Sequence, residues 1–151
     1  MESLTVRHLD GDRFGISIRD HHLTVDQPVD HGGADSAPTP TELFVASLTA
    51  CVGFYAQRYL VRHGLPAEGL AVTATYDTAA RPARVSTVDV TLQLPDGVPE
   101  ERRAGLLAVA SHCTVHNSLT TPPNVSVSLD QSRNTPCPHG SSRVRDKEII
   151  P

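Results

Sequence analysis

The chain has 151 residues, 38% of them apolar, and a formal net charge of −4 from 13 basic and 17 acidic side chains. This length and composition indicate one globular domain. The scattered basic residues, nearly all arginine, give neither the basic footprint of a nucleic-acid binder nor a polybasic membrane patch. The first ten residues, MESLTVRHLD, also lack the apolar core of a secretion signal.

The first forty residues predict three short strands followed by a loop. Residues 2–9 and 13–19 alternate between apolar and polar side chains on either side of Asp10-Gly11, which is a hairpin pattern. Residues 22–25 predict a third strand. Residues 27–38 are rich in Gly, Asp and Pro and predict a loop.

Residues 39–66 carry signals for both ends of a long helix. Thr39, Pro40 and Glu42 fit an N-cap, a proline at the first helical position and the glutamate of a capping box. Gly64 and Pro66 fit a left-handed C-terminal glycine and a proline beyond it. The pattern predicts a helix of roughly 24 residues, about 36 Å long.

Between positions 43 and 56 this helix is apolar or small on all faces, with Cys51 in the middle. The run is too short to cross a bilayer, which needs about 20 apolar residues. A helix that is apolar all round has to be covered all round. Because a chain of this size offers little material for that, we expect a second copy to complete the cover as a homodimer.

The second half of the chain continues the alternation of strands and helices. Residues 69–76 and 85–94 predict an antiparallel pair. A second helix follows, with Pro99 near its first position, and ends at about Ser111. Residues 113–119 predict a further helical turn.

The end of the domain is expected as a strand over residues 124–129, NVSVSL. Residues 130–151 are polar, broken by proline and glycine, and predict a flexible tail. The sequence therefore predicts an α+β domain over residues 1–129 with mostly antiparallel sheet around a long buried central helix.

Cysteine usage indicates the compartment. Cys51, Cys113 and Cys137 are an odd number and do not form the pattern of a secreted disulfide framework. We expect a cytoplasmic protein with reduced thiols.

Three segments resemble the OsmC/Ohr family of hydroperoxide-reducing proteins, in the family's order and spacing. They are the loop GGADSAPTPTEL, the helix segment ELFVASLTAC and the later segment LLAVASHCTVH. The sequence resembles the broader OsmC-like branch of the family. The resemblance implies an intertwined homodimer in which long helices lie between antiparallel sheets built from both chains.

The resemblance also implies a thiol chemistry. Cys51 matches the peroxidatic thiol, which attacks a peroxide as a thiolate and becomes a sulfenic acid. Cys113 matches the resolving thiol, which condenses with that sulfenic acid to a disulfide. An external dithiol then reduces the pair, and neither metal nor organic cofactor is required.

The groups that would activate Cys51 are less clear in the sequence. The apolar neighbours of Cys51 disfavour the charged thiolate. Peroxidases of the family use an arginine held by a glutamate, but the glutamate position falls on Thr41, and Glu42 comes one residue later. Glu42 is then a capping residue or a displaced partner of the arginine. Arg13 is the best match for the arginine, and Arg58 is a second candidate on the same helix as Cys51.

Other readings of these residues stay open at this point. Cys113 is also typical of a small buried residue at a helix end, and His116 of a capping or core histidine. His112–His116, HCTVH, is a weak metal pattern without a second cluster. Cys137 has no family counterpart and predicts an exposed spare thiol.

Two functions follow as hypotheses. The first is a peroxidase for organic hydroperoxides in oxidative-stress defence, because apolar neighbours of Cys51 such as Phe44, Leu48 and Phe54 favour alkyl or lipid peroxides. The second is a small-molecule or redox-binding protein on the same scaffold, with weak or no peroxidase activity. The displaced glutamate and the absence of arginine from residues 27–38 favour the second.

Overall fold

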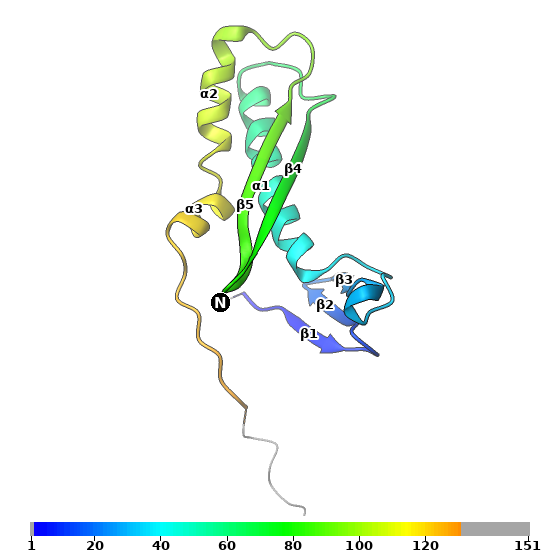
Figure 1. The fold of residues 1–151 in the computed structure, drawn as a ribbon. Helices are drawn as coiled ribbons and strands as arrows, with labels where there is room; N and C mark the ends of the chain where they lie inside the picture. The colour runs from blue at the N-terminus through cyan, green and yellow to red at the C-terminus, as the bar shows by residue number, and fades with distance from the viewer. Residues whose placement is uncertain (1, 131–151) are drawn as a thin grey trace, which may run out of the picture.

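The structure is a computed structural model, and it describes residues 2–130. A three-stranded sheet comes first, then a long helix, a two-stranded hairpin and two shorter helices (Figure 1). Both sheets are antiparallel, which confirms the predicted α+β class. The described chain has no helix that is long and apolar enough to cross a membrane.

The N-terminal sheet is formed by β1 (Thr5–His8), β2 (Phe14–Ile18) and β3 (His21–Val25) in chain order. The predicted hairpin and third strand are thus confirmed. Gly11 turns the first hairpin at φ +49°, a backbone conformation that glycine adopts without steric cost. Figure 1 shows this sheet beyond the N-terminal end of the long helix, at the opposite end from the second helix.

The long helix α1 spans Pro40–Arg62, close to the predicted bounds. Its capping box is complete: Glu42 N–H donates to Thr39 Oγ1 at 3.1 Å, and Thr39 N–H donates to Glu42 Oε2 at 2.7 Å. Gly64 follows the helix at φ +66° and acts as the expected left-handed terminator. Two of the free N–H groups that every helix start leaves are therefore satisfied by local side chains.

The loop before α1 is organised around a buried carboxylate, Asp26, of which 1% is exposed. It accepts hydrogen bonds from Gln27 N–H at 2.8 Å, Ala34 N–H at 3.3 Å, Ser36 N–H at 2.9 Å and the Ser36 hydroxyl at 2.7 Å. Asp26 N–H in turn donates to the carbonyl just before the cap of α1. The hydrogen bonds from Ser36 lower the pKa of Asp26 from 3.8 to about 2, against the opposing effect of burial. This carboxylate fixes the path of the chain into α1.

Gly33 lies in the same loop, where a side chain has no room. A Cβ atom at this position would meet the Gln27 carbonyl oxygen at 1.9 Å. The loop thus depends on a glycine for close backbone approach and on a carboxylate for its hydrogen bonds.

Replacing Asp26 with asparagine is expected to make stability less sensitive to acid. Because the folded pKa of about 2 lies below the ordinary 3.8, the ionised group stabilises the fold above about pH 4. That contribution is lost as the pH falls from about 4 to about 2. Urea unfolding measured from pH 7 downward should therefore show the two proteins furthest apart at neutral pH and converging below pH 4. A gap in unfolding free energy that stays constant with pH would contradict the assignment.

The second hairpin consists of β4 (Ala71–Ala80) and β5 (Ala83–Gln93), paired antiparallel with a register shift between Asp77 and Thr78. It confirms the predicted pair and is longer at the turn. The helix α2 spans Glu100–Ala110, with Pro99 as its N-cap rather than its first residue. The helix α3 spans Thr114–Thr120, the predicted extra turn.

The core lies where α1 meets the second hairpin on one side and α2 and α3 on the other. Its most deeply buried members are Ala56, Leu60, Leu106, Ala110 and Cys113, each between 0% and 2% exposed. However, the rest of the chain covers α1 on only part of its surface. Phe44, Phe54 and Val61 on α1 remain 39%, 54% and 58% exposed. One chain therefore covers part of the apolar helix, and the rest of its apolar surface is open.

The prediction of a strand over residues 124–129 is wrong for this chain. In the described chain these residues belong to no sheet, and Figure 1 shows the segment running away from the domain. Its alternating apolar side chains, Val125, Val127 and Leu129, are 82%, 95% and 87% exposed. The alternation is that of a strand, but a strand needs a neighbouring edge, and this chain does not bring one beside it.

Candidate active site at two cysteines

The two cysteines in the described residues come from different elements. Cys51 lies in the middle of α1 and is half-buried. Cys113 is the N-cap of α3 and has 0% exposure. Both are free thiols. The long helix and the link from α2 to α3 thus place one accessible and one enclosed sulfur in the same packed region.

The two thiols are neighbours. Burial raises the pKa of the Cys113 thiol, and the adjacent Cys51 thiol raises it further, both through their side-chain contact and through its charge. The N–H of His116, which donates to Cys113 Sγ at 3.5 Å, acts in the opposite direction. Cys113 is therefore a thiol held mainly in its neutral form, directly beside the thiol of α1.

A hydrogen bond joins the two cysteine-bearing segments. Tyr55 lies one helical turn after Cys51, and Thr114 directly follows Cys113. The Tyr55 and Thr114 hydroxyls are 2.9 Å apart, across 59 positions of sequence. On its outer side, the Tyr55 ring meets Phe54 edge-on at 5.9 Å between centroids. The contact fixes the start of α3 against the Cys51 turn of α1.

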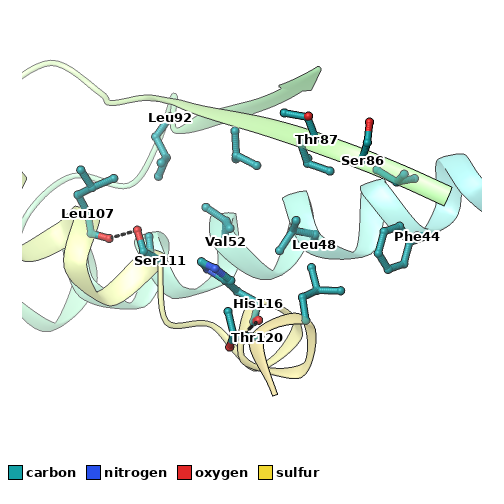
Figure 2. Close-up of a pocket in the computed structure, with 15 residues that line it drawn as sticks. Phe44, Leu48, Val52, Ser86, Thr87, Leu92, Leu107, Ser111, His116 and Thr120 are labelled. Carbon is teal, nitrogen blue, oxygen red and sulfur yellow. Dashed lines mark hydrogen bonds between the residues drawn. The ribbon is translucent and has the colours of Figure 1, made fainter. Parts of the chain in front are cut away.

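A cavity of about 470 Å³ lies beside this region, between α1, β5, α2 and α3. Figure 2 shows Phe44, Leu48 and Val52 along α1 on one wall, with His116 of α3 opposite β5. Its lining is mostly apolar, with a few hydroxyls and the imidazole as polar groups. Neither cysteine lines it, although Leu48 and Val52 flank Cys51 on the helix and His116 bonds Cys113. The size and lining suit a small, largely apolar ligand.

The expected activating groups are elsewhere in the single chain. Arg13 lies directly before β2, at the end of the first hairpin turn, and its Nη1 is 3.6 Å from the Asp10 carboxylate. Glu42 is held in the capping box, as one of the two sequence interpretations predicted. The Arg58 guanidinium lies 5.4 Å from the centroid of the Phe54 ring. In the described residues, none of the three makes a hydrogen bond or ion pair with Cys51.

The Nε atom of Arg13 is not accounted for by the ion pair with Asp10. This atom is buried and has no hydrogen-bond partner among the described residues. Buried N–H groups are nearly always paired. The side chain therefore has an unused donor.

The other two sequence expectations concern metal and the third cysteine. Residues 2–130 contain no group of three or more His, Cys, Asp or Glu side chains placed to hold a metal ion. The side chains of His112 and His116 are separately engaged, His112 Nδ1 with the Ala108 carbonyl at 2.8 Å and His116 at the cavity wall. Cys137 and all but the first residue of the predicted tail lie outside the described residues.

Residues 32–128 match the family model described as OsmC-like protein. The chain belongs to this OsmC-like family. The matched segment contains both cysteines, the loop around Gly33 and all of α1, α2 and α3. No curated protein matches the sequence.

Solved structures share the OsmC-like fold at low sequence identity. A candidate osmotic-stress-induced and detoxification-response protein from Psychrobacter arcticus is 23% identical, with a TM-score of 0.73 over 78% of this chain and 88% of the other. An organic hydroperoxide resistance protein, OsmC, from Legionella pneumophila is 20% identical, with a TM-score of 0.58 over 79% and 90%. An organic hydroperoxide resistance protein from Elizabethkingia anophelis is 20% identical, with a TM-score of 0.61 over 78% of this chain and 88% of the other. These likenesses establish the fold.

Two features of the structure, one beside the cysteines and one in the loop before α1, have weak or no signal in the sequence. The Tyr55–Thr114 contact could be suspected from the four-residue spacing between Cys51 and Tyr55, which places both on one helix face. The hydrogen bonds of Asp26 could not, because an aspartate in a Gly/Asp/Pro loop is ordinarily a solvated turn residue.

Proposed function

We propose that this OsmC-like protein reduces organic hydroperoxides with Cys51 as the peroxidatic thiol and Cys113 as the resolving thiol. The observation that carries the proposal is the pairing of an accessible thiol on α1 with an enclosed thiol at the start of α3. The difference in access supports these roles, because Cys51 is half-buried and open to a peroxide whereas Cys113 is 0% exposed.

The reaction balances with these two thiols and an external dithiol. The Cys51 thiolate attacks a peroxide oxygen, so that an S–O bond forms, the O–O bond breaks and an alcohol leaves. The Cys113 sulfur then attacks the resulting sulfenic acid, which expels water and forms a disulfide. A dithiol reductant returns both thiols, and a reducing cytoplasm is the compartment that fits this cycle.

The substrate would be an organic rather than a small inorganic peroxide. The apolar cavity beside the thiols, walled by Phe44, Leu48 and Val52, suits an alkyl group. Cumene hydroperoxide should accordingly give a higher kcat/KM than hydrogen peroxide.

A homodimer is part of the proposal. The open apolar surface of α1 and the exposed side chains of Val125, Val127 and Leu129 are the kind of surface that a second copy would cover. In the intertwined pair that the family resemblance implies, sheets from both copies enclose the long helices. Such an arrangement would bring an Arg13 of the second copy toward Cys51 and give its buried Nε an acceptor. Sedimentation equilibrium tests this: a Val125→Asp and Val127→Asp double variant should shift from dimer to monomer.

The test of the peroxidase is a mass measurement. Reduced protein is mixed with one equivalent of cumene hydroperoxide, quenched with an alkylating agent and mapped by peptide mass. Rapid loss of two thiols, both in one Cys51–Cys113 disulfide, is the expected result. Slow oxidation, spread over all three cysteines, would overturn the proposal.

The second candidate function is small-molecule or redox binding without peroxidase activity. Two observations favour it: Glu42 is committed to the capping box, and the 470 Å³ cavity is a pocket in its own right. Binding of an apolar fluorescent probe that a hydroperoxide cannot displace, in a protein whose thiols stay reduced, would support this function over the first.

A further inference from the structure

We propose that Tyr55 and Thr114 are positioning residues for the step in which the disulfide forms, and that they hold Cys113 in reach of an oxidised Cys51. The inference rests on the proposed function and adds to it a pair of residues that act through the placement of the two thiols. The pair is called the hydroxyl latch below.

The latch joins the two cysteine-bearing segments close to the sulfurs. Tyr55 lies one turn from Cys51, on the same helix face, and Thr114 is the first helical residue after Cys113. Its 2.9 Å hydrogen bond is the one side-chain hydrogen bond between α1 and α3 in residues 2–130. The other side-chain hydrogen bonds of α3 do not reach α1: Ser118 Oγ donates to the Thr114 carbonyl at 2.9 Å, and Asn117 Nδ2 donates to the His112 carbonyl at 3.2 Å.

The start of α3 needs a tertiary contact that holds it in place. The helix is seven residues long, and isolated helices of that length do not hold together in water. After Thr120 the chain continues into the extended segment described above, which is exposed in the single chain. Without the latch, α3 and its cap would be held against α1 by apolar packing and by the contact of the two thiols, and packing does not fix position as a directional bond does.

Position matters most in the condensation step. The Cys113 sulfur has to attack the Cys51 sulfur in line with the departing oxygen while its own proton leaves, and the products are the disulfide and water. Intramolecular steps of this kind depend strongly on geometry, and a misplacement of about 1 Å can cost on the order of 100-fold in rate. Attack of Cys51 on the peroxide does not involve Cys113, so the latch should leave that first step unchanged.

The test separates the two steps. Tyr55→Phe and Thr114→Val remove one hydroxyl each and keep the shape of the side chain. With limiting cumene hydroperoxide, both variants should form sulfenic acid at the parental rate, measured by trapping with dimedone. Both should then form the disulfide at least about 10-fold more slowly, with more sulfinic acid when peroxide is in excess.

Three controls distinguish positioning from loss of structure. Thr114→Ser keeps a hydroxyl and should restore the rate of disulfide formation. The double variant should be no slower than either single variant, because both remove the same bond. Tyr59→Phe removes the next tyrosine hydroxyl along α1 and should leave both steps at the parental rate. A Tyr55→Phe protein that condenses at the parental rate, or that slows both steps equally, would overturn the latch.

The latch can be tested even if the proposed peroxidase function is wrong. If the parental protein forms no sulfenic acid, the latch is measured by equilibrium with oxidised dithiothreitol, which makes the same disulfide without peroxide. The effective concentration of the two thiols should then fall about 10-fold in Tyr55→Phe and Thr114→Val and return in Thr114→Ser. An unchanged effective concentration would overturn the latch in this assay as well.

Discussion

Replacing Cys51 with serine is expected to lower the rate of organic hydroperoxide reduction by about 1000-fold or more, to the rate of the uncatalysed reaction with the external dithiol. The serine hydroxyl keeps nearly the same volume, so that the half-buried site on α1 should stay folded. It does not ionise at neutral pH, and it therefore offers no nucleophile to the peroxide. Removal of a nucleophile typically costs several orders of magnitude. The measurement is consumption of cumene hydroperoxide with dithiothreitol as reductant.

Cys113→Ser is the matched control, since it makes the same chemical change at the second thiol. In the absence of a reductant, that variant should still consume one equivalent of peroxide, at the parental rate, and stop at a sulfenic acid on Cys51. The distinction follows from access, because Cys113 is 0% exposed and a peroxide reaches Cys51 first. If the Cys51→Ser protein turned over peroxide as fast as the parent, Cys51 would have no part in the chemistry.

Truncating Leu106 to alanine is expected to cost about 2–5 kcal/mol of unfolding free energy, the range for a leucine removed from a packed core. Leu106 is 2% exposed and belongs to the cluster that also contains Leu60, Ala110 and Cys113. The loss combines the apolar area returned to water with the cavity that the neighbours cannot refill. Urea denaturation followed by circular dichroism gives the number, with the two proteins compared at the same concentration.

The next residue supplies the control. Leu107 directly follows Leu106 in α2 but is 56% exposed, and it lines the cavity beside β5. Alanine there keeps helix propensity and loses little burial, so its effect on unfolding should stay near 0.5 kcal/mol. Equal losses at the two positions would mean that burial in the single chain does not govern their contribution.

Local signals predicted the helices and strands well. The capping box of Thr39 and Glu42 lies within four consecutive residues, and its two hydrogen bonds form as expected. Strand alternation is equally local, which is why both hairpins were found. The segment over residues 124–129 differs, because alternation predicts what a strand looks like and not which edge receives it.

The site was harder to predict from the sequence, because its contacts join distant positions. No pattern along the chain brings Cys51 to Cys113, and the family resemblance supplied that pairing. The hydrogen bond between Tyr55 and Thr114 spans 59 positions and depends on how α3 packs against α1. Asp26 is similar on a smaller scale, since its partner Ser36 is ten residues away across an irregular loop. Such contacts follow from tertiary packing, which periodicity does not encode.

If the proposed disulfide forms, the full enclosure of Cys113 decides where it is reduced. An incoming dithiol would reach the sulfur of Cys51 and not that of Cys113, so the mixed disulfide should form at Cys51 and Cys113 should depart. The departing sulfur returns to a place where His116 N–H already points at it, 3.5 Å away. Reduction would then have a fixed order: the dithiol attacks the sulfur on α1, and the thiol at the start of α3 is released first.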